Sequence, residues 1–239
     1  MMSESVQPLN AIILCGGLST RLGDIAKTTP KVLLPVGDRT VLDWQLEKLK
    51  SLGVDEVILA AGHLADVVLK DAGVERRGVR LKYAIEKERL GTGGAIKFAL
   101  EHVKDKQAPT IILNGDILTT IDVAQMLQVL RTDSEGLILG SLVPDAASYG
   151  TLVYDQSGLM KEFCEKEGIA KPGYINGGFY IFTPQAHKYF PNQATFSIEY
   201  DVFPRMKNLY VYESDHPWID VGLPERLQWA REHWQEFLS

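Results

Sequence analysis

Two positively charged residues follow a glycine pair near the start of the chain. An apolar run at residues 11–15 ends at Gly16-Gly17, and Arg21 and Lys31 come soon after. Glycine has no Cβ, so the backbone N–H groups of such a pair can surround an anion. Arginine offers a planar fork of donors and lysine a mobile point charge, so the two act differently on phosphate oxygens. The segment therefore predicts a triphosphate site.

The spacing of these glycines excludes two common phosphate loops. No G-x-x-x-x-G-K-[ST] sequence is present here, and Gly16, Gly17 and Gly23 do not form G-x-G-x-x-G. A glycine pair after a strand can also be a plain tight turn. The added charges of Arg21 and Lys31 favour phosphate binding over that alternative.

Two aspartates end apolar segments that lie far apart in the sequence. Asp116 comes shortly after the apolar run 110–113, and Asp220 closes a second run and is followed by Gly222. Mg²⁺ typically takes one or two carboxylates together with substrate phosphates. Each aspartate has an alternative, Asp116 as a turn or cap residue and Asp220 as the N-cap of a helix that begins near residue 224. Together with the phosphate loop, the pair predicts a Mg²⁺ site.

Strand-like and helix-like segments alternate along the chain. The predicted strands are residues 11–15, 56–61, 80–85, 110–114 and 136–142. The predicted helices are residues 41–52, 93–103, 123–130 and 224–238. This order is typical of an α/β fold with a Rossmann-like, doubly wound sheet. Ligands bind at the carboxyl ends of the strands in such sheets, so the loops that carry the glycine pair and Asp116 should meet.

A smaller β-rich lobe is expected in the second half of the chain, which makes the sheet mixed. Its shorter strands are predicted at residues 152–154, 159–164 and 175–182. Composition marks no linker or repeat. We therefore expect one domain over residues 1–239, with an approximate division into a core at 1–143 and the lobe with the C-terminal helices at 144–239.

Composition excludes several classes of protein. A chain of 239 residues with 45% hydrophobic residues can bury a full core. A net charge of −6 argues against a nucleic-acid partner, and no apolar run is long enough to span a membrane. Cys15 and Cys164 make no disulfide framework, and residues 1–8 show no signal peptide. We expect a cytoplasmic enzyme without nucleic-acid or membrane partners; the sequence leaves open whether it is a homo-oligomer.

From residue 11 to residue 225 the motifs follow the order of a known family. Residues 11–36 resemble the signature loop of sugar-1-phosphate nucleotidyltransferases, G-G-x-G-T-R-L followed by P-K-x-L-x-P-V. N-G-D at 114–116 and W-x-D-x-G at 218–222 resemble the two metal-holding motifs of that family. The segments I-E-K-E-x-L-G-T-G-G-A-I at 85–96 and I-N-G-G-F-Y at 175–180 are most similar to D-glycero-D-manno-heptose 1-phosphate guanylyltransferases of bacterial surface-polysaccharide pathways.

The resemblance implies a reaction and a set of residues for it. An oxygen of a sugar 1-phosphate attacks the α-phosphorus of a nucleoside triphosphate in line, and pyrophosphate leaves. No general base is needed, because the attacking phosphate is already ionised at neutral pH. The implied catalytic residues are Arg21, Lys31 and Asp116, and the implied metal ligands are Asp116 and Asp220. The implied nucleotide-binding residues are Leu14, Gly16, Gly17, Ser19, Thr20, Arg21, Glu86, Gly91, Thr92 and Asn114.

The family's second glycine-rich loop, which holds the nucleobase, corresponds to residues 86–95. Guanine presents N1–H and an exocyclic amine, which one carboxylate can accept together. Uracil and thymine present acceptor, donor, acceptor, which suits a glutamine amide. Glu86 therefore favours GTP. The alternatives are that Glu88 faces the base or that both are ordinary exposed loop charges.

The sugar 1-phosphate is expected in the smaller lobe. Carboxylate and amide groups suit sugar hydroxyls, and a lysine can neutralise the phosphate. By resemblance, the matching positions are Gly150, Glu165, Lys166, Asn176 and Gly177. For the neighbours Glu165 and Lys166, a solvated surface pair is the plain alternative.

Two residues depart from the family pattern. Ser19 stands where the phosphate loop usually has glycine, so its backbone must avoid positive φ or accept strain. Arg89 replaces a proline that is common before Leu90-Gly91, which should loosen the base loop.

Three functions remain open from the sequence. The first is a guanylyltransferase for heptose or mannose 1-phosphate, and the second is a thymidylyl- or uridylyltransferase for a hexose or amino-sugar 1-phosphate. The third is an inactive homologue that binds a nucleotide sugar as a regulatory subunit. The presence of Arg21, Lys31, Asp116 and Asp220 argues against the third.

Overall fold

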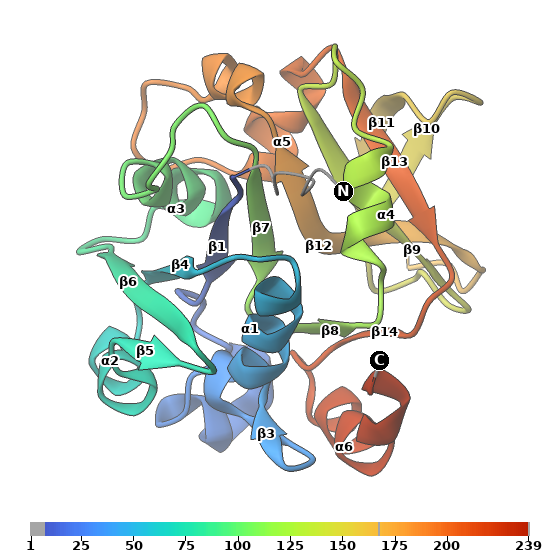
Figure 1. Cartoon of the computed structure of the whole chain (residues 1–239). Helices are drawn as coiled ribbons and strands as arrows, with labels where there is room; N and C mark the ends of the chain where they lie inside the picture. Colours follow the sequence, from blue (N-terminus) through green and yellow to red (C-terminus); the bar gives the residue numbers. More distant parts are fainter. Residues whose placement is uncertain (1–7, 167, 239) are drawn as a thin grey trace, which may run out of the picture.

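One mixed β-sheet runs through the molecule (Figure 1). The structure, a computed structural model, describes residues 8–166 and 168–238. Within them the strand order is β11-β10-β12-β7-β1-β4-β6-β5, and β9 pairs with both β12 and β13. The strands of this sheet are β1 (Asn10–Leu14), β4 (Glu56–Ala61), β5 (Glu75–Arg76), β6 (Val79–Ile85), β7 (Thr110–Asn114), β9 (Gly136–Val143), β10 (Thr151–Tyr154), β11 (Met160–Cys164), β12 (Gly173–Phe182) and β13 (Leu209–Ser214).

The central strands of the sheet are parallel. β7, β1, β4 and β6 run side by side in one direction, whereas β12 runs antiparallel to both β7 and β9. β1, β4 and β7 are apolar along most of their length, as expected for strands that are covered on both faces.

Helices cover both faces of the sheet (Figure 1). They are α1 (Val41–Ser51), α2 (Ala65–Ala72), α3 (Gly91–Leu100), α4 (Val123–Gln128), α5 (Ile198–Asp201) and α6 (Pro224–Glu232). α1, α2 and α4 share a buried cluster with Ile13 of β1, whereas α3 and α5 share another with the neighbouring Ile12. Successive residues of a strand point to opposite faces, so both layers are anchored on one strand. The predicted doubly wound α/β fold with a mixed sheet is confirmed.

Short elements complete the chain beside the main sheet. They include the strand pairs β2 (Pro35–Val36) with β3 (Arg39–Thr40) and β8 (Ile117–Thr119) with β14 (Trp218–Asp220). The 3₁₀ turns are η1 (Thr20–Lys27), η2 (Lys31–Leu33), η3 (Pro184–Tyr189), η4 (Phe203–Arg205) and η5 (Trp234–Phe237).

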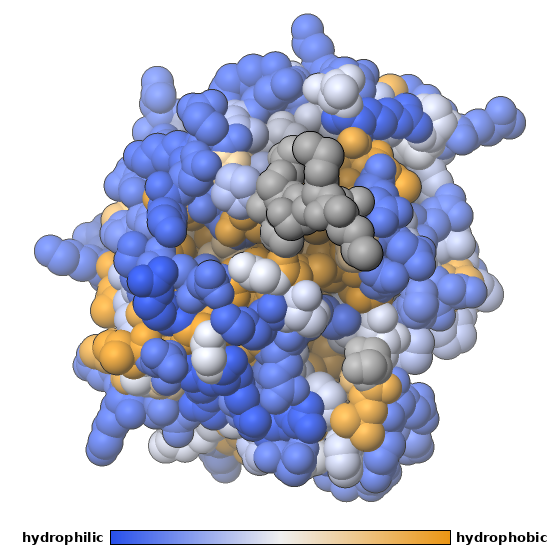
Figure 2. All heavy atoms as spheres, in the orientation of Figure 1, coloured by the Kyte–Doolittle hydropathy of each residue, from blue (hydrophilic) through white to orange (hydrophobic). Residues whose placement is uncertain are grey.

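Polar side chains cover the outside of the helices. α2, for example, buries Ala65 and Val68 and exposes Asp66 and Lys70. Figure 2 shows hydrophilic residues over most of one face of the molecule, with apolar residues visible between them. Among the described residues, no helix has the length and apolar character that crossing a bilayer requires.

The structure differs from the sequence prediction in several elements. α2 and β13 were not predicted, and the helix predicted at residues 224–238 ends at Glu232 and is followed by the 3₁₀ turn η5. The sheet also crosses the approximate division at residue 143, because β9 pairs with β12 and β13. The division into two parts stays a prediction.

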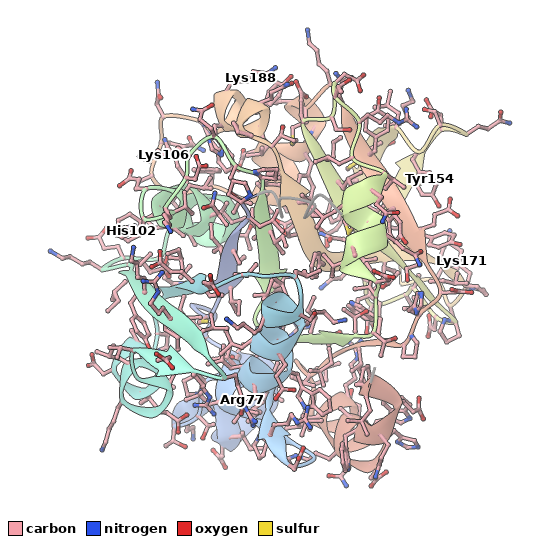
Figure 3. All side chains as sticks on the ribbon, viewed as in Figure 1. Arg77, His102, Lys106, Tyr154, Lys171 and Lys188 are labelled. Atoms are coloured by element: carbon pink, nitrogen blue, oxygen red, sulfur yellow. The ribbon has the colours of Figure 1, made fainter. Side chains whose placement is uncertain are left out.

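A buried carboxylate fixes the start of α1 against the β5–β6 hairpin. Thr40 and Asp43 form a capping box at the first turn of α1. Asp43 also accepts hydrogen bonds from Arg76 at 2.8 Å and from Arg77 at 2.9 Å (Arg77 is labelled in Figure 3). Burial alone would raise the pKa of Asp43, but the hydrogen bonds from both arginines and Thr40 hold it well below its usual range.

We expect Asp43→Asn to lower the free energy of unfolding by about 2 kcal/mol at pH 7, because two guanidinium groups lose their carboxylate. The folded-state pKa of Asp43 lies below the unfolded value of about 3.9, so this contribution is present above that value. It is lost as the pH falls through the folded pKa. Urea unfolding of both proteins at pH 7 and pH 3 measures the change, and the difference should shrink at pH 3.

Asp38→Asn is the matched control, because the Asp38 side chain is 64% exposed and pairs with Arg39 at the surface. It should cost at most about 0.5 kcal/mol. Equal losses of unfolding free energy in the two variants would contradict the proposed stabilisation by the buried Asp43 carboxylate.

Candidate active site

The carboxyl ends of the parallel strands meet around a cavity of about 300 Å³. Its walls include Leu14 at the end of β1, Glu86 just after β6 and Asn114 at the end of β7. This is the edge of an α/β sheet at which ligands bind. The predicted site residues in the lining are Leu14, Gly16, Gly17, Ser19, Lys31, Glu86, Gly91, Thr92, Asn114 and Asp116.

Six further residues line the cavity: Cys15, Val32, Ala60, Arg89, Ala95 and Gly115. Arg89 and Ala95 belong to the predicted base loop at 86–95 and Gly115 to the N-G-D motif, whereas Cys15, Val32 and Ala60 were not named as site residues. Burial raises the pKa of the Cys15 thiol to about 12, so the group stays neutral near pH 7 and is not activated as a nucleophile. The small apolar residues give no signal in a single sequence, because any buried helix or strand has them.

The loop after β1 keeps Ser19 in a conformation that favours glycine. Its φ is 54° and its ψ 25°, and its hydroxyl donates to the carbonyl of Gly17 at 3.4 Å. Of the two possibilities that the sequence left open, Ser19 thus accepts the left-handed region, at a cost of about 1 kcal/mol. Thr20 and Arg21 follow in η1 and are exposed, outside the lining of the cavity.

Lys31 and Asp116 form an ion pair at the floor of the crevice. Lys31 Nζ lies 2.5 Å from Asp116 Oδ2, and the two side chains are only 18% and 23% exposed. The pair joins the turn η2 to the loop between β7 and β8. It holds the lysine charge at the edge of the sheet, where phosphate oxygens would lie.

The strand pair β8–β14 brings Asp220 to the same place. Asp220 lies opposite Ile117 in this pairing, and the N–H of Val221 donates to the carbonyl of Asp116 at 2.8 Å. The helix-cap alternatives are wrong for both aspartates. Leu223 is the N-cap residue of α6, and Asp122 caps α4.

Three charged groups surround Gly222. A Cβ on Gly222 would lie 2.9 Å from Asp220 Oδ1, 3.1 Å from Lys31 Nζ and 3.5 Å from Asp116 Oδ2. Glycine is therefore the residue that lets this backbone approach the charged groups so closely. Asp220 Oδ1 also accepts the N–H of Gly222 at 3.0 Å, and Asp220 Oδ2 accepts from Arg226.

The donor set fits a hard divalent cation. Asp116 and Asp220 supply carboxylate oxygens, which Mg²⁺ prefers. Within residues 8–166 and 168–238, no group of three or more His, Cys, Asp or Glu side chains could hold a metal ion. Two carboxylates leave room for phosphate oxygens and water in an octahedral shell, the usual arrangement for magnesium beside a substrate phosphate.

Glu86 lies at the end of the cavity that faces α3. Its Oε2 accepts the N–H of Leu90 at 3.3 Å, and a Cβ on Gly16 would lie 3.0 Å from Oε1. Burial raises the pKa of Glu86 above its usual value. Glu88 is exposed and absent from the cavity lining, so Glu86 is the carboxylate that faces the cavity.

The start of α3 is held by the segment before α5. The carbonyl of Phe196 accepts the N–H groups of Gly93 at 3.1 Å and Gly94 at 3.3 Å. Thr92 Oγ1 accepts the N–H of Ile198 at 3.0 Å and donates to Glu199 Oε2 at 2.8 Å. The loop in which Arg89 replaces proline is thus tied at its end to a second segment.

The predicted sugar-side residues fall into two groups. Gly150, Asn176 and Gly177 lie together: the carbonyl of Gly150 accepts the N–H of Asn176 at 3.0 Å, and the carbonyl of Gly177 accepts Trp218 Nε1–H at 2.8 Å. Trp218 belongs to the strand that ends at Asp220. Glu165 and Lys166 follow β11 and are exposed. All five predicted sugar-side residues lie outside the cavity lining.

Gln45 supports the turn that carries Asp116, a role that sequence reasoning missed. Its Nε2 donates to the carbonyls of Asn114 at 2.8 Å and Ile117 at 3.0 Å, and the residue is 4% exposed. The available signal was a glutamine at a position of α1 that faces the core. The amide nitrogen thus finds two partners, as a buried polar group usually must, whereas Gln45 Oε1 is buried without a hydrogen-bond partner in the described part of the chain.

Residues 10–236 match the nucleotidyl transferase family. The chain belongs to this family. A D-glycero-alpha-D-manno-heptose 1-phosphate guanylyltransferase of Campylobacter jejuni is 38% identical over 219 residues, which cover 91% of this chain and 96% of the relative. The catalytic subunit beta of a mannose-1-phosphate guanylyltransferase from Drosophila pseudoobscura is 35% identical over 221 residues, 90% of this chain and 59% of the longer relative.

Solved structures of similar proteins have the same fold. The crystal structure of HddC from Yersinia pseudotuberculosis complexed with GMP-PN matches this nucleotidyl transferase with a TM-score of 0.83 at 30% identity, covering 94% of this chain and 99% of that one. A UDP-glucose pyrophosphorylase at 18% identity and a TM-score of 0.76 shows the fold alone. The predicted family and its enzyme class, a nucleotidyltransferase, are confirmed.

We expect Gln45→Met to lower the free energy of unfolding by about 1–3 kcal/mol, because two backbone carbonyls lose their donor while the volume is nearly conserved. Chemical denaturation of the purified nucleotidyl transferase measures the change. Gln125→Met, at an exposed position of α4, is the control and should change stability by less than about 0.5 kcal/mol. Similar losses of unfolding free energy in both variants would show that the hydrogen bonds from Gln45 to the turn of Asp116 contribute nothing to stability.

Proposed function

We propose that this nucleotidyltransferase transfers GMP from GTP to a sugar 1-phosphate and releases pyrophosphate, with D-glycero-D-manno-heptose 1-phosphate as the first acceptor to test. The observation that carries the choice of nucleotide is the position of Glu86 in the cavity wall. Both relatives at 35% and 38% identity are named as guanylyltransferases, and the Yersinia structure was determined with GMP-PN.

Glu86 offers the acceptors that guanine requires. In the proposed complex its carboxylate receives N1–H and the exocyclic amine of guanine as a pair. The hydrogen bond from Leu90 to Oε2 orients the carboxylate while each oxygen keeps a further lone pair. A pyrimidine would place an acceptor opposite this carboxylate, which is unfavourable.

The phosphates would extend from the base toward Gly16, Gly17 and Lys31. Backbone N–H groups of the glycine loop and the Lys31 ammonium group are the donors at that end of the cavity. Arg21, exposed in η1, adds positive charge from the adjoining loop.

The reaction needs positioning and charge neutralisation. An oxygen of the acceptor phosphate forms a bond to the α-phosphorus while the bond to the leaving pyrophosphate oxygen breaks. Lys31, held by Asp116 at 2.5 Å, would stabilise the charge that develops on the α-phosphate. Mg²⁺ held by Asp116 and Asp220 would neutralise phosphate charge and align the groups. The acceptor is already ionised, so no residue has to remove a proton.

The acceptor sugar is proposed to contact Gly150, Glu165, Lys166, Asn176 and Gly177. The first candidate is the heptose 1-phosphate, since the Campylobacter relative matches over nearly its whole length. Mannose 1-phosphate is the second, because the Drosophila relative covers 90% of this chain. A thymidylyl- or uridylyltransferase and an inactive regulatory homologue are further alternatives, against which Glu86 and the Lys31–Asp116 pair argue.

We expect Asp116→Asn and Asp220→Asn each to raise the Mg²⁺ concentration for half-maximal rate, because a neutral amide holds a hard cation less well. Rates measured across a Mg²⁺ titration at saturating substrates give this value. Asp122→Asn, at the cap of α4, is the control and should keep the parental value. Unchanged Mg²⁺ dependence in both site variants, or full activity in EDTA, would contradict the metal site.

We expect Glu86→Gln to lower kcat/KM for GTP by about 10- to 100-fold, because a donor then faces a donor, a mismatch of about 1–3 kcal/mol. The same change should harm UTP and dTTP much less. The measurement is pyrophosphate release by both proteins from GTP, UTP, dTTP, CTP and ATP with heptose, mannose and glucose 1-phosphates. Lys31→Ala, which should lose activity with every pair, shows that the measured rate arises at this site.

Equal losses for purine and pyrimidine triphosphates would show that Glu86 only supports the loop. Wild-type activity with dTTP or UTP in preference to GTP would replace the guanylyltransferase proposal by the thymidylyl- or uridylyltransferase alternative. Nucleotide-sugar binding without turnover of any pair would indicate the regulatory homologue.

A further inference from the structure

Asp220 faces two positive charges, one on each side. Its Oδ1 lies on the side of Gly222, where Lys31 Nζ and Asp116 Oδ2 also lie. Its Oδ2 accepts a hydrogen bond from Arg226 Nη1 in the first turn of α6. In Figure 1, α6 lies directly below the β8–β14 pair. The row of charged groups that begins with Lys31 and Asp116 therefore extends past Asp220 to a second cation.

Arg226 belongs to a half-buried cluster that was not predicted. Its side chain is 18% exposed, and its guanidinium carbon lies 4.4 Å from the centre of the Tyr149 ring. Tyr149 in turn meets Trp218 edge to face, with the ring centres 5.5 Å apart. Trp218 binds the carbonyl of Gly177 at 2.8 Å, so the cluster adjoins the proposed sugar-side residues.

Helix stability gives no reason for an arginine at this position. The first turn of a helix carries the positive end of the helix dipole, which disfavours a cation. Partial burial adds a desolvation cost that the single carboxylate of Asp220 offsets in part. A residue type that is unfavourable for the local helix, as this arginine is, often has a functional role.

The guanidinium group keeps donors for a ligand. Arginine has five N–H donors in a planar fork, and the bond to Asp220 uses one. Its guanidinium carbon lies over the Tyr149 ring, and the Tyr149 hydroxyl faces the Asp220 carboxylate. A phenol hydroxyl can both donate and accept, so it can turn to a phosphate oxygen. A guanidinium group and a hydroxyl therefore lie together beside Asp220, with the Lys31 ammonium group on the side of Oδ1.

The proposed reaction requires a cation at this place. A sugar 1-phosphate must approach a triphosphate, and both are anions. Lys31 is paired with Asp116 at 2.5 Å, on the nucleotide side of Asp220. Neither Arg226 nor Lys166, the lysine expected to neutralise the sugar phosphate, is in the cavity lining, but Lys166 is exposed whereas the Arg226 side chain is only 18% exposed. Arg226 is a half-buried cation that lies between Asp220 and the Gly150–Gly177 region.

We propose that Arg226, together with the Tyr149 hydroxyl, binds the phosphate of the acceptor sugar 1-phosphate. The inference rests on the proposed function and names the residue that receives its second substrate. Asp220 then connects the two substrates, since Oδ1 faces the metal and nucleotide side while Oδ2 orients the guanidinium group. One phosphate oxygen attacks the α-phosphorus, the bond to pyrophosphate breaks and its electron pair leaves with pyrophosphate, so no proton is transferred.

The test compares Arg226→Met, Arg226→Lys and Tyr149→Phe with Arg231→Met. Arg231 lies on the same helix and donates to the carbonyl of Pro35, away from the crevice, so it is the matched control. We expect Arg226→Met to raise the KM for the sugar 1-phosphate by about 10- to 100-fold, the loss of a charge-assisted hydrogen bond. The KM for GTP and the half-saturating Mg²⁺ concentration should stay within about twofold, and Arg226→Lys should recover part of the loss.

A purely structural Arg226 would give a different pattern. If Arg226 only holds Asp220, Arg226→Met shifts the Mg²⁺ dependence and lowers kcat, while the KM for the sugar 1-phosphate changes no more than that for GTP. That result would overturn the proposal, as would equal changes in the Arg231→Met control. If circular dichroism shows that Arg226→Met does not fold, Arg226→Lys and Tyr149→Phe decide by the same comparison of the two KM values.

Calorimetric binding of mannose 1-phosphate in the presence of Mg²⁺ gives a readout without turnover. The proposal expects binding by the wild type and a loss of at least about 10-fold with Arg226→Met. This pattern without turnover of any nucleotide would support the role of Arg226 while the proposed function fails. Turnover by the wild type with an unchanged acceptor KM in Arg226→Met would overturn this inference alone. Neither binding nor turnover of any sugar 1-phosphate by the wild type would overturn both.

Discussion

The antiparallel pairing of β8 with β14 is the constraint on which the candidate active site depends. It joins a segment that follows the central strand β7 to a segment near the C-terminus, and it places Asp220 beside the loop of Asp116. Neither aspartate alone distinguishes this crevice from an ordinary strand end. The two aspartates then position three other groups. The Lys31 ammonium group pairs with Asp116, the guanidinium group of Arg226 bonds to Asp220, and the backbone of Gly222 passes close to both carboxylates.

The elements that the sequence predicted best depend on local signals. β4 and β7 have the predicted bounds, β6 begins one residue earlier, and β1 begins and ends one residue earlier. The agreement is close because apolar runs bounded by polar and glycine residues are visible in the sequence itself. The glycine pair and Glu86 line the cavity as expected. Among the missed elements, α2 is a short helix and β13 is a strand whose partner β9 lies far away in the sequence.

The residues of the site were predictable to the same degree as the strands, because both are visible as local patterns in the sequence. Residue types that suit phosphates and metals are visible one at a time, and the topology of a parallel sheet brings strand ends together. The contacts of Gln45 with Asn114 and of Arg226 with Asp220 depend on side-chain orientation across distant elements, which no spacing rule gives. In the structure, these contacts are recognised because a buried polar side chain normally has hydrogen-bond partners.

The carbonyl of Phe196 at the start of α3 limits how a ligand can enter the cavity. A free helix N-terminus attracts anions, but here the N–H groups of Gly93 and Gly94 are already taken by that carbonyl. The opposite end of the cavity keeps the glycine loop and Lys31 for an anion. An anionic group in the cavity therefore finds the donors of the glycine loop and Lys31 near β1, whereas the N–H groups of Gly93 and Gly94 are not available to it.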